Sequence, residues 1–291
     1  MVLVRRLWFV AIVAMFATSS VRLAKAGFTQ TEAAGPEATL IQAAVDSFRA
    51  SLGSLNPNNG QSFAAGRREI NWDAVPDTFA DPNLLPGDFF NQAAGGRARG
   101  ASFSTPGTGF LVTADSSNPS NATLGLGYPA DFRPFSAERL FTPIGSLITD
   151  VTFFVPGTVT TAATVAGFGV VFSDVELANT TKVEFFNDAN DLLLSHFVLR
   201  EPASGGFSFF GAVANSGERI ARVRITTGDE VVFGNNSFGG GSDAVIMDDF
   251  IYSEPIVFSA VPEPSTACLL GIAVVACGAY TRLRRTTARK A

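Results

Sequence analysis

Two pairs of carboxylates have the residue types and spacing that acid–base catalysis requires. Glu69 and Asp73 lie four positions apart, and Asp248 and Asp249 are adjacent. Two carboxyl groups separated by about 5 to 10 Å can cleave a glycosidic bond, one as acid and the other as base or nucleophile. Neighbouring residues of a strand point to opposite faces, so Asp248 and Asp249 share a cleft only if the strand bulges there. Turns, helix caps and calcium ligation are the alternatives, and we expect no catalytic residues.

Calcium ligation is the second chemistry that the acidic residues allow. Hard cations take carboxylate and amide oxygens, which residues 187–191 (Asn-Asp-Ala-Asn-Asp) supply between two apolar runs. This segment lacks the spacing and the closing glutamate of an EF-hand loop. A hairpin turn is the alternative for 187–191, and backbone hydrogen bonding is the alternative for 248–249. We expect no cofactor other than calcium. Its candidate ligands are Asp188, Asn190, Asp191, Asp243, Asp248 and Asp249.

Arg67, Arg68 and Trp72 form a candidate ligand-binding group. Planar guanidinium groups match acidic sugars, and an indole ring can stack on a sugar ring. A buried core position is the alternative for Trp72, because Ile70 and Val75 flank it. Ion pairing with Glu69 or Asp73 is the alternative for Arg68.

One histidine and two cysteines limit the remaining chemistry. His196 lies in an apolar run, so His-dependent triads and multi-histidine metal sites are excluded. Cys268 and Cys277 lie in an apolar C-terminal segment, so the body before it has no thiol or disulfide. Residues 27–260 contain 12 Lys and Arg against 25 Asp and Glu, a net charge of about −13. We do not expect such an acidic body to bind nucleic acid.

The elements that would position these side chains begin with one helix. Pro36 suits a first helical position, apolar residues between 40 and 52 recur at helical spacing, and Gly53 suits a C-terminal cap. The segment 56–60 (Asn-Pro-Asn-Asn-Gly) then breaks the chain. We therefore expect residues 27–60 to form an N-terminal helical extension.

Residues 61–256 have the pattern of an all-β domain. Short β-branched and aromatic runs alternate with Gly, Pro, Asn and Asp. Most of the 27 phenylalanines should lie in its core, because Phe has no polar group to leave at a surface. Eight runs predict a jelly-roll-like β-sandwich, and they cover residues 109–113, 148–155, 165–172, 181–186, 192–199, 206–213, 220–226 and 245–252.

Alternation within these runs predicts which faces meet water. The run 165–172 is almost entirely apolar, which is typical of a strand buried on both faces. The runs 181–186 and 221–226 alternate between polar and apolar residues and should each have one exposed face. The residues expected there are Lys182, Glu184, Phe186, Arg222, Arg224 and Thr226.

The first 26 residues have the pattern of a signal peptide. Arg5 and Arg6 precede an apolar run at 7–17, and Ala24 and Ala26 provide the small residues of a cleavage site. The apolar run is too short to span a bilayer stably. We expect signal peptidase to cleave after Ala26.

The last thirty residues carry a second targeting pattern. Two prolines keep the chain extended, as a protease cleft requires. The apolar run that follows predicts a transmembrane helix at about 266–281, which reaches only about 21 to 24 Å across a ~30 Å hydrocarbon core. Arginines after it would lie on the cytoplasmic side. The motif is Val261, Pro262, Glu263, Pro264 and Ser265, and the basic tail includes Arg282, Arg284 and Arg285.

Residues 261–286 resemble the PEP-CTERM sorting signal of Gram-negative bacteria in motif, helix and arginine cluster. The resemblance implies that an exosortase recognises this tail and removes it at the outer surface. Such tails are also labelled ice-binding protein C-terminal domains, a label that describes the route of export and implies nothing about ice. A plain membrane anchor is the alternative.

These patterns together predict an exported protein that is not an enzyme. It would cross the inner membrane, be anchored transiently by the C-terminal helix, and then reach the cell surface or extracellular matrix. There it would bind or organise exopolysaccharide. A carboxylate-dependent polysaccharide hydrolase or lyase and a purely structural adhesion protein are the two alternatives.

Overall fold

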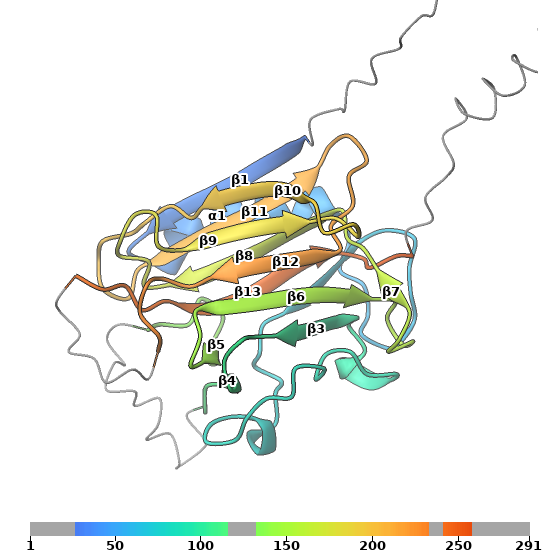
Figure 1. Ribbon diagram of the computed structural model, residues 1–291, viewed down its shortest axis with the longest axis horizontal. Coiled ribbons are helices and arrows are strands. Elements are labelled where there is room, and N and C mark those ends of the chain that lie inside the picture. Colours follow the sequence, from blue (N-terminus) through green and yellow to red (C-terminus); the bar gives the residue numbers. More distant parts are fainter. Residues whose placement is uncertain (1–26, 116–131, 233–240, 258–291) are drawn as a thin grey trace, which may run out of the picture.

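A computed structural model describes residues 27–115, 132–232 and 241–257 of the chain (Figure 1). Two antiparallel sheets pack face to face around a shared core, and one helix lies on the outside of the first sheet. The predicted all-β sandwich with one N-terminal helix is thereby confirmed. The predicted signal peptide, sorting motif, transmembrane helix and basic tail lie outside the described residues. Within the described ranges, no helix is long and apolar enough to cross a membrane.

The two sheets are each built from strands distant in sequence. The first sheet has the order β1 (Phe28–Gly35), β11 (Phe207–Ala214), β8 (Gly167–Ser173), β13 (Ile246–Ser253), β5 (Phe141–Ile144) and β4 (Gly109–Val112), with β2 (Arg67–Ile70) also paired to β13. The second sheet has the order β10 (Leu192–Phe197), β9 (Lys182–Phe186), β12 (Arg222–Thr226), β6 (Ile148–Phe154) and β3 (Ala101–Ser104), with β7 (Ala162–Ala163) paired to β6. Single 3₁₀ turns lie at Asp77–Phe79 and Gly95–Arg97.

All eight predicted strands are present, with ends displaced by at most two residues. Strand β8 is buried along its whole length, as its apolar sequence predicts. Strands β9 and β12 alternate between buried and partly exposed residues, which confirms one exposed face for each. Hydrophobic periodicity therefore identifies both the strands and their inner faces.

Helix α1 (Ala38–Leu52) confirms the predicted helix and covers the outer face of the first sheet. Its buried stripe packs on β8, β11 and β13. Phe48 lies above Gly169 and Gly211, where a Cβ atom would come within 2.6 and 2.7 Å of the ring. The two glycines therefore allow the helix to lie close to the sheet.

Strand β1 is an element that sequence analysis did not predict. All eight of its residues pair with β11, from Phe28 with Ala214 to Gly35 with Phe207. Its sequence, Phe-Thr-Gln-Thr-Glu-Ala-Ala-Gly, has few of the β-branched and aromatic residues that mark strands. Residues 27–60 thus contribute an edge strand to the first sheet as well as the helix.

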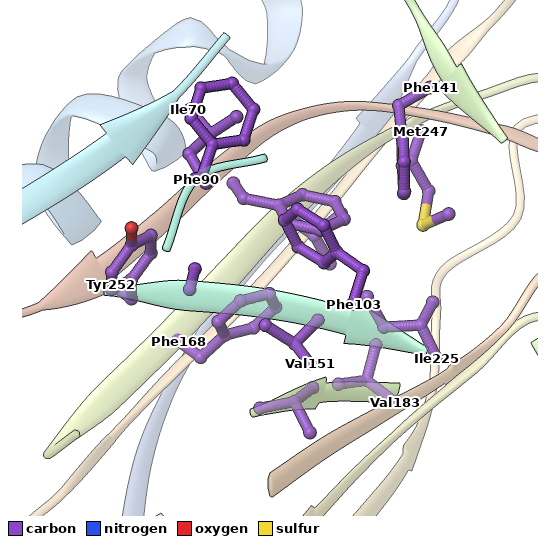
Figure 2. Close-up of a cluster of buried hydrophobic side chains, with 14 of the residues drawn as sticks. Ile70, Phe90, Phe103, Phe141, Val151, Phe168, Val183, Ile225, Met247 and Tyr252 are labelled. Atoms are coloured by element: carbon purple, nitrogen blue, oxygen red, sulfur yellow. The ribbon is translucent and has the colours of Figure 1, made fainter. Parts of the chain in front are cut away.

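The core between the sheets is dominated by aromatic rings. Figure 2 shows Phe103 of β3 and Phe141 of β5, whose ring centroids lie 5.3 Å apart. Trp72 stacks on Phe141 with centroids 4.0 Å apart and planes 1° apart, and its indole N–H donates to the backbone oxygen of Asp248 at 2.9 Å. Only 1% of Trp72 is exposed, so the proposed ligand-stacking role is wrong and the core alternative is correct.

Candidate functional site

A β-bulge in β13 brings Asp248 and Asp249 to the same partner. Met247 pairs with Phe172 and Phe250 with Val170, so the two aspartates together oppose a single residue of β8. The Ser136 hydroxyl oxygen lies 3.2 Å from Oδ1 of Asp248 and 2.6 Å from Oδ1 of Asp249. The condition under which both carboxylates share one site is therefore met.

Burial determines the protonation of this pair. Loss of water contact raises the pKa of the Asp248 carboxyl well above its ordinary value, and the charge of Asp249 raises it further. Backbone amides of Phe135 and Ser136 donate to Oδ2 of Asp248 at 2.6 and 3.1 Å, which opposes this rise. Burial also raises the pKa of Asp249. The two carboxyl groups thus hold protons to a higher pH than free aspartates do.

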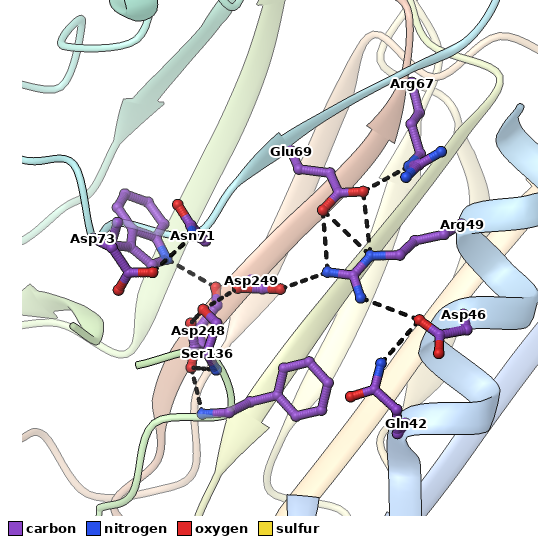
Figure 3. Close-up of polar contacts among 12 residues, drawn as sticks. Gln42, Asp46, Arg49, Arg67, Glu69, Asn71, Asp73, Ser136, Asp248 and Asp249 are labelled. Atoms are coloured by element: carbon purple, nitrogen blue, oxygen red, sulfur yellow. Dashed lines mark hydrogen bonds and ion pairs between the residues drawn. The ribbon is translucent and has the colours of Figure 1, made fainter. Parts of the chain in front are cut away.

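Arg49 of α1 connects this pair to Glu69 of β2, as Figure 3 shows. Its Nη2 atom lies 2.8 Å from Oδ2 of Asp249 and 3.1 Å from Oε2 of Glu69. Arg67 binds the other Glu69 oxygen at 2.6 Å. Contacts among Arg49, Glu69, Asp248 and Asp249 thus join the helix to the first sheet.

The carboxylates of the second pair, Glu69 and Asp73, have separate hydrogen-bond partners. Glu69 binds the two arginines described above, whereas Asp73 accepts hydrogen bonds from the Asn71 side chain at 2.7 Å and the Arg139 amide at 3.2 Å. Burial raises the pKa of Asp73.

The predicted ligand-binding role of Arg68 is also wrong, whereas that of Arg67 stays a prediction. Arg68 is fully buried, and its Nε and Nη2 atoms bind Glu254 at 2.6 and 2.8 Å. The guanidinium also donates to backbone oxygens, including that of Gln61 at 2.7 Å. Arg68 is thus ion-paired, but with Glu254 rather than with Glu69 or Asp73. The donors of Arg68 are already used within the fold. Arg67 binds Glu69, and 18% of its side chain stays exposed.

The candidate calcium ligands do not converge. Residues 187–191 form a hairpin turn in which the Asn187 side chain accepts from the Asp191 amide at 2.7 Å. Asn190 accepts a hydrogen bond from Arg222. Asp243 accepts a hydrogen bond from the Glu176 amide at 2.9 Å. Its partner therefore lies in a different loop from the partners of the bulge in β13. Within the described part of the chain, no group of three or more His, Cys, Asp or Glu residues is placed to hold a metal ion.

The outer face of the second sheet is a different kind of surface. Helix α1 packs on strands of the first sheet, and Figure 1 shows no described helix in front of β9, β12 and β6. We call the outward side chains of these three strands the open face. They are Ile148, Asp150, Thr152 and Phe154 of β6, Lys182, Glu184 and Phe186 of β9, and Arg222, Arg224 and Thr226 of β12.

An ordered set of charges covers the middle of the open face. Arg222 lies opposite Phe186, with its guanidinium carbon 3.9 Å from the ring centroid. Asp150 accepts from Arg222 at 2.9 Å and from Arg224 at 2.9 and 2.8 Å. Burial alone would raise the pKa of Asp150, but hydrogen bonds from Arg224 and Arg222 lower it. Planar donors and an aromatic ring are thus fixed next to one another on the open face.

Two shallow pockets lie beside the C-terminal end of α1. Their volumes are about 200 and 270 Å³, and Ser51 and Val213 line both. Arg219 and Glu254 contribute polar groups to the first pocket, and Asn215 contributes to the second. Burial lowers the pKa of Arg219, which donates to Thr164.

Comparisons with protein-family models and with curated proteins find no match to this chain. The sequence signal for the open face was the polar–apolar alternation of β9 and β12, which predicted exposure without indicating a ligand. The convergence of Ser136 on Asp248 and Asp249 had no sequence signal beyond two acidic residues within an apolar run.

Proposed function

We propose that this chain is a secreted, non-catalytic protein of the cell surface or extracellular matrix that is sorted by an exosortase and binds or organises exopolysaccharide. The observation that carries the proposal is the position of the two ends of the predicted mature body. Gly27 directly follows the predicted signal peptide, and Ile256 lies five residues before the predicted sorting motif at Val261.

The connection between β11 and β12 contacts the chain near both ends. The Asn215 amide donates to the Gly27 oxygen at 3.0 Å. Arg219, four residues later, donates to Thr164, and Thr164 forms a β-bridge with Ile256. Both ends therefore lie at one end of the sandwich (Figure 1). This position is compatible with a signal peptide and a C-terminal helix that enter the same membrane in succession.

A jelly-roll topology is part of the proposal. Eight strands give the orders β5-β13-β8-β11 in the first sheet and β6-β12-β9-β10 in the second. Along the chain these strands pass repeatedly from one sheet to the other, as two interlocked Greek keys do. Strands β1, β2, β3, β4 and β7 extend this core.

The partners of the buried carboxylates support a non-catalytic body. Asp248 is held by two backbone amides, Asp249 by Arg49 and Ser136, and Glu69 by two arginines. Asp249 and Glu69 thereby hold α1 on the first sheet through Arg49, and Asp248 holds the loop that contains Phe135 and Ser136. Binding a substrate there would require breaking these contacts, whose removal in a buried site is costly.

The open face supports polysaccharide binding. The open face can contact several residues of an extended glycan, because guanidinium and carboxylate groups can hydrogen-bond the hydroxyl or acidic groups of the glycan. Phe186 adds an apolar surface beside Arg222. The experiment is isothermal titration of acidic and neutral glycans into the purified chain, with and without calcium.

Variants of the open face give that experiment its control. We expect Arg222→Ala and Phe186→Ala to weaken glycan binding by about tenfold, because buried or stacked anchors typically contribute more than 1 kcal/mol. Arg200→Ala removes an exposed arginine from the connection between β10 and β11 and should leave binding unchanged. Absence of any bound glycan at millimolar concentration contradicts the binding role. Self-association without glycan binding would instead support the adhesion alternative.

The bulge in β13 supports a hydrolase or lyase as the second candidate function, because it places two protonatable carboxyl groups beside one serine hydroxyl. That candidate predicts release of reducing or unsaturated sugar ends from a polysaccharide. It also predicts that Asp249→Asn abolishes this release while the protein remains folded.

A further inference from the structure

The Glu218 carboxylate lies at the point where export would create a new chain end. The Gly27 backbone nitrogen donates to Oε1 of Glu218 at 2.8 Å. The second carboxylate oxygen accepts from the Ser216 amide at 3.0 Å, which fixes its orientation within the turn. Gly27 is the residue that follows the expected signal-peptidase cleavage site after Ala26.

We propose that the turn between β11 and β12 is a binding site for the α-ammonium group of the processed N-terminus, with Glu218 as its counterion. The proposal rests on the export proposed above. Cleavage adds water across the Ala26–Gly27 peptide bond: hydroxyl goes to the Ala26 carbonyl carbon and hydrogen to the Gly27 nitrogen. That nitrogen then takes a further proton at neutral pH. A neutral amide donor is thereby replaced by a cation on the same atom.

The surroundings of the site suit a glycine terminus. A Cβ atom on residue 27 would lie 2.3 Å from Oδ1 of Asn215, so a larger residue would displace that side chain. Asn215 in turn holds the Gly27 oxygen. The neighbouring cation, Arg219, donates to Thr164 through Nε at 3.0 Å and does not contact the carboxylate. The carboxylate therefore has both oxygens directed at backbone donors, one of which is the Gly27 nitrogen.

The ion pair would fasten the edge strand of the first sheet. Strand β1 starts at Phe28 and pairs only with β11 among the described strands. Partial burial alone would raise the pKa of Glu218, but hydrogen bonds from the Gly27 and Ser216 amides lower it. An α-amino group has an ordinary pKa of about 7.7 to 8.0, which a carboxylate partner raises. Its contribution to stability is present below that range and is lost as pH rises through the raised pKa.

The test compares two chains that differ at this end. One contains residues 27–291 with a free α-amino group, and the other retains residues 1–26; each is made with Glu218 and with Glu218→Gln, in the same detergent. We expect Glu218→Gln to lower the thermal midpoint at pH 6.5 by about 1 to 3 °C more in the chain that begins at Gly27. At pH 9.5 the difference between the two chains should disappear.

A second measurement does not depend on stability. The rate at which the α-amino group of Gly27 is acylated at pH 7 should rise about threefold in Glu218→Gln, because the carboxylate no longer raises its pKa. Equal thermal shifts in both chains together with an unchanged acylation rate would overturn the proposed site. A native N-terminus other than Gly27 would overturn the export assignment instead. The difference in thermal midpoint between the two recombinant chains would still show whether the turn binds an α-ammonium group.

Discussion

Arg68 and Glu254 form a buried ion pair in which Nε lies 2.6 Å from Oε2 and neither side chain is more than 1% exposed. Glu254 also accepts from the Asn56 side chain at 2.9 Å and the Phe63 amide at 3.1 Å. One carboxylate thus fastens the loop before β2 to the end of β13. Removal of either charge would leave the other buried without its partner.

The first prediction concerns this ion pair. Glu254→Gln should lower the free energy of unfolding by about 3 to 5 kcal/mol, because the Arg68 charge stays buried. Urea denaturation at pH 7 measures the change. Glu37→Gln is the control, since Glu37 pairs with Arg133 at the surface and should contribute at most about 1 kcal/mol. If both variants lost the same free energy of unfolding, burial would not explain the effect of Glu254→Gln.

The second prediction concerns pH. Because Asp248 has a raised pKa in the folded chain, the folded state binds its proton more tightly than the unfolded state. Stability should therefore fall as pH rises above about 4, until the raised pKa is passed. Asp248→Asn should flatten this fall in urea denaturation curves measured from pH 4 to pH 8. An unchanged pH profile in the variant would assign the dependence to other groups.

The third prediction concerns the contact between α1 and the first sheet. Gly211→Ala should lower the free energy of unfolding by about 1 to 3 kcal/mol, because the new methyl group collides with the Phe48 ring. Gly96→Ala has no atom within 4 Å of its added Cβ and should be nearly neutral. Thermal unfolding of both variants measures the difference. Equal stability of the two variants would show that the close approach of helix and sheet does not contribute to stability.

The fourth prediction joins the open face to glycan binding. Asp150→Asn removes the anion that holds Arg222 and Arg224, and so frees both guanidinium groups for an acidic ligand. Affinity for an acidic glycan should rise about twofold to fivefold, as expected for partly exposed charge pairs, while stability falls by about 1 kcal/mol. Titration calorimetry measures the first effect. An unchanged affinity would place the ligand elsewhere, and a weaker one would contradict the predicted competition between Asp150 and an acidic ligand.

Strong periodic patterns made most of the fold predictable. Strand β8 is apolar throughout, and β12 alternates between arginines and aliphatic residues, so both could be recognised from sequence. Strand β1 could not, because its polar, alanine-rich sequence is stabilised by pairing with β11 over its full length. Tertiary contacts override local propensity there.

The candidate site was less predictable than the fold. Trp72 and Arg68 had the right chemistry for a ligand, but chemistry alone does not reveal burial, and each has its partners within the core. Asp248 and Asp249 were identified as a pair only on condition of a bulge, and a bulge depends on the register between strands. The pairing of Arg222 with Phe186 across two strands likewise follows from register.

The most direct test of export is mass spectrometry of the mature termini, taken from separated membrane and extracellular fractions of the native cell. Sorting by an exosortase predicts extracellular protein that begins at Gly27 and ends near Pro264. Protein that stays in the membrane with Arg282, Arg284 and Arg285 still attached would contradict that sorting and identify an anchored envelope protein instead.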